Sequence, residues 1–121
     1  MPAYNARPFI EESIRSVLSQ DYGNIELLVI DDGSSDGTPE VAQEFGDQVT
    51  VLRQINAGPA AARNRGMAAA TGDFIAFLDA DDVWLPGKMA AQVQYLQNHP
   101  EVGVVFSRWH CQQDGVFGAP T

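Results

Sequence analysis

The sequence predicts an α/β fold in which helices alternate with the strands of a mainly parallel sheet. Segments with helical spacing of apolar residues alternate with short, nearly continuous apolar runs, which is typical of parallel strands joined by right-handed helical crossovers. The chain has 121 residues, of which 45% are hydrophobic, enough for one modest core. We therefore expect a single domain over residues 1–121.

The first part of the chain has the pattern helix, strand, helix, strand. Apolar residues recur at helical spacing near the N-terminus, with charged residues on the opposite face. The run IELLVI is then nearly continuous, as in a strand that is covered on both faces. Thr38 before Pro39 is typical of an N-cap followed by proline at the first helical position, and Gly46 is a typical helix end. We expect helices at 7–20 and 38–45 and strands at 25–30 and 49–53.

The remaining part repeats this alternation. Residues 59–70 begin with proline and are rich in alanine, which favours a helix. The run FIAFL has the composition of a buried strand, and the last apolar run is VGVVFSRW. Helical spacing between these two runs ends at His99 and Pro100, and the glycine-containing tail is typical of a turn. We expect helices at 59–70 and 85–98 and strands at 74–78 and 102–109.

Charge and cysteine content argue against several classes of protein. Seven Lys and Arg against sixteen Asp and Glu give a net charge of −9, which disfavours binding to nucleic acid or to an anionic membrane surface. The apolar runs are shorter than the roughly 20 residues of a membrane helix, and the opening residues lack the pattern of a signal peptide. The single cysteine, Cys111, cannot form an internal disulfide, which fits a reducing compartment. We expect a cytoplasmic protein.

The first acidic cluster is the segment 31–38, with the sequence DDGSSDGT. It follows a predicted strand, and ligands of open α/β sheets bind beyond the carboxyl ends of strands. Asp31 and Asp32 could accept hydrogen bonds from a base or a sugar, while Gly33 and Gly37 allow tight turns beside a ligand. The alternative is an Asx-type turn that only connects strand to helix, and Asp36 is best explained in this structural way.

The second acidic cluster follows the apolar run FIAFL and contains Asp79, Asp81 and Asp82. Alternation in an extended segment would place Asp79 and Asp81 on the same side, where both could bind one hard cation such as Mg²⁺ or Mn²⁺. The alternative is a capping cluster before the turn at Trp84, and this explanation suits Asp82.

A third candidate segment, INAGPAAARNRG, lies between the two acidic clusters. Gly58 and Pro59 could start a helix whose free amide groups face an anion, with Arg63 and Arg65 nearby in the sequence. A diphosphate would need such local positive charge in an acidic protein. The alternative is an ordinary alanine-rich packing helix with solvated arginines.

Four segments, in the order MPAYN, LLVIDDGSSDGT, NAGPAAARNRG and GDFIAFLDADDVWLP, resemble the nucleotide-binding half of inverting family 2 glycosyltransferases. The resemblance spans residues 2 to about 109 and implies the Rossmann-like GT-A fold. It implies that the nucleotide is contacted by Pro2, Ala3, Tyr4, Asp32, Gly58, Arg63, Asp79 and Ala80. It also implies that Asp81, with Asp79, binds the Mg²⁺ or Mn²⁺ that bridges the diphosphate. Tyr4 could stack on the base.

The implied reaction transfers a sugar from a nucleotide diphosphate donor to an acceptor hydroxyl with inversion at the anomeric carbon. The metal would neutralise the charge that grows on the departing nucleoside diphosphate. A UDP-sugar is the expected donor, and the expected acceptor is a glycan or a lipid-linked sugar in polysaccharide or cell-envelope synthesis. In a full-length protein this reaction could take place at the inner face of the membrane.

The sequence departs from that family in two places. Relatives carry the general base on a later Asp or Glu, beyond the position of Thr121, and nothing singles out Asp114 for this role. Relatives also have an apolar strand before the PAYN segment, whereas this chain opens with Met1 and Pro2. We expect a truncated chain that keeps donor binding and lacks the first strand, the acceptor half and the base. A second copy of the chain could cover the strand edges left unpaired.

Two other classes of function stay open at this point. A noncatalytic nucleotide-sugar binding module would also lack the general base. A phosphoacceptor receiver domain has a similar length and an acidic Mg²⁺ pocket, but it requires a lysine in the loop after a late strand. The only lysine here, Lys88, follows the acidic cluster on a predicted helix. Phosphate uptake from acetyl phosphate would favour the receiver, whereas saturable binding of a nucleoside diphosphate would favour the transferase.

Overall fold

The computed structural model describes residues 1–113 and 116–117. Two compact units divide the chain. The first, Met1–Ala90, contains a three-stranded parallel sheet with its helices, and the second begins at Ala91. The α/β prediction is therefore confirmed for the first unit, which holds all the predicted site residues. The helices of the described part of the chain are all too short or too polar to cross a membrane.

The parallel sheet has the strand order β1-β2-β3. Its strands are β1 (Pro2–Ala3), β2 (Leu28–Asp31) and β3 (Thr50–Arg53). The strands predicted at 25–30 and 49–53 are thus present, with shifted ends. The sequence predicts that the apolar strand before the PAYN segment is missing; within that segment, Pro2 and Ala3 form a short strand that pairs with Ile30 and Asp31 of β2. The carboxyl ends of the strands therefore meet at one edge, beside Asp31 and Asp32.

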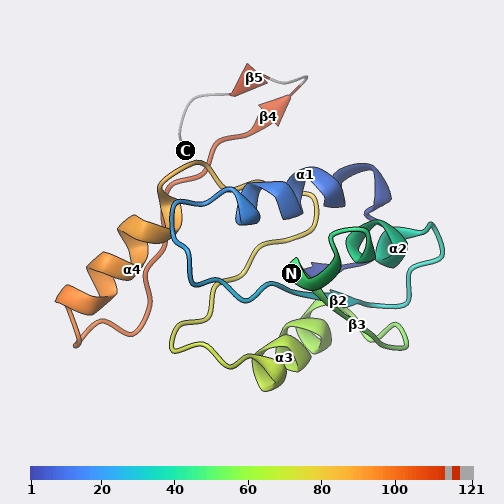
Figure 1. Cartoon of the computed structure of the whole chain (residues 1–121), viewed down its shortest axis with the longest axis horizontal. Helices are drawn as coiled ribbons and strands as arrows, with labels where there is room; N and C mark the ends of the chain where they lie inside the picture. Colours follow the sequence, from blue (N-terminus) through green and yellow to red (C-terminus); the bar gives the residue numbers. More distant parts are fainter. Residues whose placement is uncertain (114–115, 118–121) are drawn as a thin grey trace. The chain divides into compact units, whose positions relative to one another are not determined.

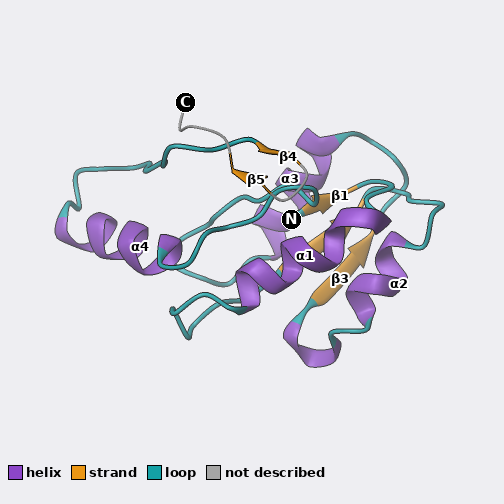
Figure 2. Ribbon diagram, turned by 90° about the horizontal axis from the view of Figure 1, so that it is seen from above, coloured by secondary structure: helices purple, strands orange, loops and turns teal. Residues whose placement is uncertain are grey.

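Helices cover both faces of this sheet, as Figures 1 and 2 show, with α1 and α2 on one face and α3 on the other. The helical segments are α1 (Arg7–Leu18), α2 (Thr38–Gln43), the short 3-10 helix η1 (Gly46–Gln48), α3 (Pro59–Ala69) and α4 (Lys88–Asn98). Each predicted helix is present, shortened at one or both ends. The last of them, α4, continues into the second unit.

The main core lies between α1 and the sheet. Ile10, Ile14 and Val17 recur at helical spacing on α1, and all three are almost completely buried together with Val29 of β2. Burying side chains of this size stabilises the fold by roughly 1.5–3 kcal/mol each. The amphipathic pattern of α1 therefore determines which of its faces packs on the sheet.

The opposite face of β2 packs against α3 at close range. Ala62 of α3 is fully buried, and a Cβ atom added at Gly66 would lie 3.4 Å from the Ile30 side chain. Small residues at these two positions, one helical turn apart, allow the helix to approach the sheet closely. Gly66, which interrupts an otherwise alanine-rich helix, is thus explained by packing.

The start of α2 differs from the prediction. Gly37, with φ 86°, is the N-cap residue, and Thr38 is the first residue of the helix. The Thr38 hydroxyl instead accepts a hydrogen bond from the Ala6 amide at 2.9 Å. Thr38 does not cap its own helix because its side chain connects α2 to the segment that enters α1.

Two predicted strands, at 74–78 and 102–109, do not form in the structure. Residues 74–77 are exposed in a loop after α3, and most of 102–109 is exposed as well. Both runs have the composition of strands, but a strand also requires a neighbour that completes its hydrogen bonds, and neither run has one among the described residues. In the tail, β4 (Gln112–Gln113) pairs antiparallel with β5 (Val116–Phe117), and Asp114 lies outside the described residues.

Candidate functional site

Asp32 accepts three hydrogen bonds at the carboxyl end of β2. Its Oδ1 accepts from the Gln54 side chain and the Ala57 amide, both at 2.8 Å, and its Oδ2 accepts from the Gly58 amide at 2.9 Å. The bond from Gln54, supported by those from Ala57 and Gly58, holds the pKa of Asp32 below its usual value against the opposing effect of burial. An ionised Asp32 thus shapes the loop that enters α3.

Strand geometry separates Asp32 from its neighbour Asp31. Successive side chains of a strand point to opposite faces, so Asp32 lies on the α3 face with Ile30, while Asp31 points to the other face. The Asp31 carboxylate is fully buried, with Oδ2 3.4 Å from Nε of Arg53 and Oδ1 without a hydrogen-bond partner among the described residues. Only Asp32 therefore meets Gly58 and the start of α3.

Gly58 is the N-cap of α3, with φ 92° and ψ 164°, a conformation that strongly favours glycine. Its amide donates to Asp32, so this amide is not one of the free groups that the sequence predicts for binding an anion. Sequence reasoning missed Gln54, which anchors the same carboxylate. The position of Gln54 directly after β3, the neighbour of β2, was the available signal, because ends of adjacent parallel strands meet.

The predicted nucleoside segment, Pro2, Ala3 and Tyr4, lies next to Asp32. Pro2 and Ala3 are buried, and the Ala3 carbonyl accepts a hydrogen bond from the Asp32 amide at 2.8 Å. The Tyr4 side chain is 56% exposed, so its ring is accessible for stacking. Backbone pairing between β1 and β2 thus brings these predicted residues to the same edge of the sheet.

Asn5, which follows Tyr4, binds the loop after β2. Its backbone amide donates to the Ser34 hydroxyl, and its side-chain oxygen accepts from the Ser35 backbone amide, both at 2.9 Å. Asn5 has a φ of 48°, a region that asparagine tolerates better than most residues. These contacts join the loop that carries Tyr4 to the loop that follows Asp32.

Asp36 completes this connection between loops. One of its carboxylate oxygens bonds the hydroxyl and amide of Thr38, and the other accepts from the Arg7 amide at 3.1 Å. The bond from the Thr38 hydroxyl is the main reason that the pKa of Asp36 is lowered. These bonds fit the structural explanation that the sequence suggests for Asp36.

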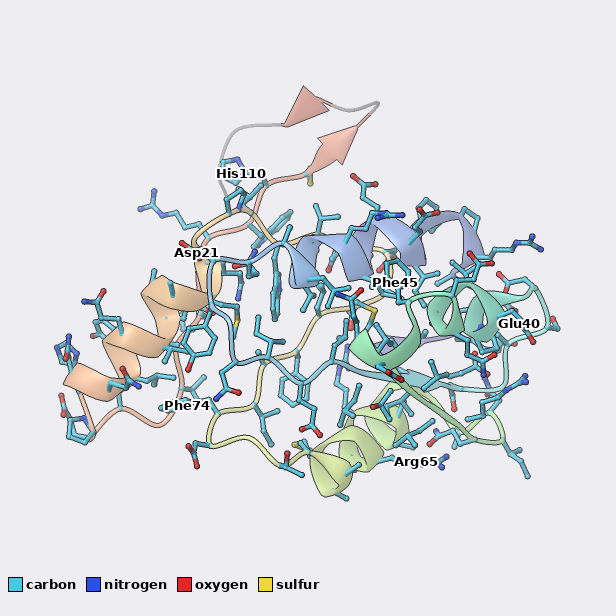
Figure 3. All side chains as sticks on the ribbon, viewed as in Figure 1. Asp21, Glu40, Phe45, Arg65, Phe74 and His110 are labelled. Carbon is cyan, nitrogen blue, oxygen red and sulfur yellow. The ribbon has the colours of Figure 1, made fainter. Side chains whose placement is uncertain are left out.

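Arg63 and Asp79 form an ion pair between α3 and the second acidic cluster. Nη2 of Arg63 lies 2.6 Å from Oδ1 of Asp79, and both side chains are partly exposed. Arg65, labelled on α3 in Figure 3, instead donates to the carbonyl of Arg53. Of the two arginines in the predicted anion-binding segment, Arg63 is therefore the one that contacts the acidic cluster.

The acidic segment, defined here as residues 79–82, turns tightly after Leu78. The Asp82 amide donates to the Asp79 carbonyl at 3.1 Å, while Ala80 is buried and Asp81 is exposed. Burial, and then the negative charges of Asp81 and Asp79, raise the pKa of Asp82. The segment therefore concentrates negative charge at this point of the surface.

The acidic segment suits a hard cation only in part. Across residues 1–113 and 116–117, no group of three or more His, Cys, Asp or Glu side chains is arranged to hold a metal ion. Mg²⁺ commonly uses one or two carboxylates and completes its shell with phosphate oxygens and water. Asp79 and Asp81 are two carboxylates, the number and type that such an ion uses, and the Asp79 carboxylate is paired with Arg63.

Helix α3 connects the two acidic clusters. At its start Gly58 donates to Asp32, and one turn later Arg63 contacts Asp79. Residues from β1, β2, α3 and the acidic segment are thus linked through one helix. The arrangement therefore places an acceptor carboxylate, an arginine and an acidic segment along one helix.

Comparison with known proteins identifies a family. The sequence model described as "Glycosyl transferase family 2" matches residues 1–121. The chain is 47% identical over 98 residues to UDP-Glc:alpha-D-GlcNAc-diphosphoundecaprenol beta-1,3-glucosyltransferase WfgD of Escherichia coli, covering 79% of this chain and 39% of that protein. It is 37% identical over 99 residues to the putative teichuronic acid biosynthesis glycosyltransferase TuaG of Bacillus subtilis, covering 78% and 39%. The chain thus spans about two fifths of the length of these relatives.

Solved structures show the same fold. The S. aureus TarS fragment 1-349 in complex with UDP-GlcNAc matches with a TM-score of 0.78 and 28% identity, covering 82% of this chain and 30% of that one. The same fragment in complex with UDP matches with a TM-score of 0.76 and 27% identity, covering 82% and 31%. The layered α/β arrangement is that of GT-A glycosyltransferases. The chain belongs to glycosyl transferase family 2.

Proposed function

We propose that this chain binds the nucleoside diphosphate part of a nucleotide-sugar donor for glycosyl transfer. The observation that carries the proposal is the link through α3. Asp32 accepts a hydrogen bond from the Gly58 amide at the start of the helix, and Arg63 further along pairs with Asp79. A nucleoside diphosphate needs a hydrogen-bond acceptor for its base and positive charge for its phosphates, and this arrangement supplies both.

Each site residue has a proposed role. Asp32 accepts a hydrogen bond from the base at the lone pair that its three donors leave available, and Tyr4 stacks on the base. Arg63 binds the diphosphate, and Asp81 with Asp79 holds Mg²⁺ or Mn²⁺ against it. The bound cation would supply Lewis-acid stabilisation of the departing diphosphate.

The proposed reaction transfers the sugar with inversion to a hydroxyl group of a glycan or lipid-linked acceptor. A UDP-sugar is the first candidate donor, because TarS has been crystallised with UDP and with UDP-GlcNAc. The names of WfgD and TuaG refer to a lipid-linked acceptor and to teichuronic acid synthesis, which supports a cell-envelope glycan as the product class. We propose no general base among the described residues.

Calorimetric titration with UDP, GDP, CDP and dTDP in the presence of Mn²⁺ tests the donor site. We expect saturable binding of UDP and weaker binding of the other three. A chain that binds none of the four would contradict the proposal. Assays for sugar transfer and donor hydrolysis distinguish an enzyme from a binding module, because a noncatalytic module would bind the donor without either reaction.

A further inference from the structure

Three polar side chains lie along one side of α1 and the residues just after it, and the apolar spacing of the helix does not predict them. Ser13 and Ser16 lie on α1, and Gln20 follows its last turn, at spacings of three and four residues that place them on one side. Ser13 is only 1% exposed and Gln20 only 8% exposed. All three side chains bond the backbone of the segment that runs from Ala80 to Met89.

Ser13 makes the contact nearest to the acidic residues. Its hydroxyl lies 2.9 Å from the carbonyl oxygen of Ala80 and 3.4 Å from that of Phe9, one turn earlier on the helix. A serine hydroxyl has a single hydrogen, and the shorter distance assigns it to Ala80. Ser13 therefore forms a link to a distant segment in place of the local bond that a helical serine usually forms.

Ser16 and Gln20 extend this link along the chain. The Ser16 hydroxyl accepts from the Trp84 amide at 3.0 Å. The Gln20 amide group donates to the Leu85 carbonyl at 3.0 Å, and its oxygen accepts from the Met89 amide at 3.0 Å. Four hydrogen bonds, two from α1 and two from Gln20 just after it, thus hold a segment that has no strand pairing of its own.

The Ser13 contact bears on the acidic residues because of where Ala80 lies in the chain. Ala80 stands between Asp79 and Asp81, and a hydrogen bond to its carbonyl restrains the peptide unit that leads into Asp81. The run before it, 74–78, lacks the strand ladder that would otherwise hold it. Two carboxylates can share one cation only if their separation is maintained, so this restraint bears directly on the cation site.

We propose that Ser13 is a positioning residue for the cation site of Asp79 and Asp81, an inference that rests on the proposed nucleotide function. It acts through the Ala80 carbonyl and touches neither cation nor nucleotide. Its loss reduces the gain in nucleotide affinity that a divalent cation provides. Metal-free recognition of the nucleoside, which depends on Asp32, stays nearly unchanged.

The test compares Ser13→Ala with Ser19→Ala in the 121-residue chain. Ser19 is exposed at the end of α1, and its hydroxyl bonds only the local carbonyl of Ser16, at 3.5 Å, so it is a matched control. UDP affinity is measured by calorimetry with and without Mn²⁺. We expect Ser13→Ala to reduce the Mn²⁺-dependent gain about tenfold, which corresponds to one hydrogen bond, and to change metal-free affinity less than about twofold. Ser19→Ala should change neither.

The outcomes separate the inference from the proposed function. A Ser13→Ala chain that unfolds cooperatively and keeps the full Mn²⁺-dependent gain overturns the positioning role but leaves the donor site intact. If that variant does not fold, Ser13→Cys replaces the hydroxyl with a somewhat larger thiol that is a weaker donor, and it should show a smaller reduction in the same direction; an unchanged gain would overturn the role. An unmodified chain without any Mn²⁺-dependent gain contradicts the proposed function, and the inference with it.

Discussion

Asp31 and Asp32 are adjacent in the chain, but their different surroundings give them different roles. Asp31 is buried against Arg53, and one of its oxygens has no hydrogen-bond partner among the described residues. Asp32 is bonded through both oxygens to the loop before α3. Strand alternation explains this division, because side chain 32 shares the α3 face and side chain 31 does not.

The carboxylates of Asp32 and Asp81 should have separable effects on UDP binding. We expect Asp81→Ala to remove the Mn²⁺-dependent gain in affinity, because the cation loses its main ligand. Asp32→Ala should weaken binding with and without Mn²⁺ to a similar degree. Calorimetry measures both, and Asp82→Ala is the control because Asp82 is assigned to the turn. A similar loss for Asp81→Ala and Asp82→Ala would refute the separate role of Asp81.

Arg63 and Arg65 provide a second matched pair. Both are arginines of α3, but only Arg63 contacts the acidic segment. We expect Arg63→Ala to weaken UDP binding roughly 10-fold or more, the effect of one lost hydrogen bond to a charged group. Arg65→Ala should change it less than about twofold. Equal effects of the two substitutions on calorimetric affinity would indicate general charge attraction and contradict a specific contact.

Elements with a strong local pattern were predictable from the sequence, and elements that depend on distant partners were not. Helix α1 follows from its apolar spacing, and β2 from its continuous apolar run. The run 74–78 has equally good strand composition but stays unpaired, because pairing depends on a neighbour that no local pattern reveals. Thr38 before Pro39 likewise has the local pattern of an N-cap. Its hydroxyl instead accepts a hydrogen bond from the Ala6 amide, a distant partner that no local pattern reveals.

The residues of the candidate site also differ in whether the sequence could predict them. Motif resemblance indicated Asp32, Arg63 and Asp79, and the structure brings each into contact with another predicted segment or with α3. Gln54 and Ser13 were not predicted, because neither belongs to a motif and each acts through a partner distant in the sequence. Their types alone, one polar residue after a strand and one serine within a helix, carry no such information.

The loop before α3 depends on the backbone conformation of Gly58. We expect Gly58→Ala to destabilise the fold by about 1–3 kcal/mol, because its φ and ψ lie in a region nearly exclusive to glycine. Gly46→Ala is the control: its φ of 59° is left-handed, and the cost should be about 1–2 kcal/mol. Added Cβ atoms meet nothing within 4 Å at either position, so steric overlap does not complicate the comparison. Urea unfolding measures both variants, and only Gly58→Ala should also weaken UDP binding.

The stability of the whole molecule should decrease in acid. The folded pKa values of Asp32 and Asp36 are lowered, so the unfolded chain binds more protons as the pH falls. The stabilisation is therefore complete above the unfolded pKa of about 3.9 and is lost as the pH falls below it toward the folded values. Thermal unfolding between neutral pH and about pH 3 should show this decrease, and Asp36→Asn should make the profile flatter. Parallel profiles for the two chains would contradict this assignment.

The central claim is that two separate parts of the molecule bind one nucleoside diphosphate together through a cation. These parts are Asp32, just after β2, and the acidic segment with Asp81. The most direct measurement compares UDP with uridine, each titrated with and without Mn²⁺. The account predicts that Mn²⁺ increases affinity for UDP and leaves affinity for uridine unchanged, because only UDP carries phosphates for the cation. Equal affinity for UDP with and without Mn²⁺ would contradict it.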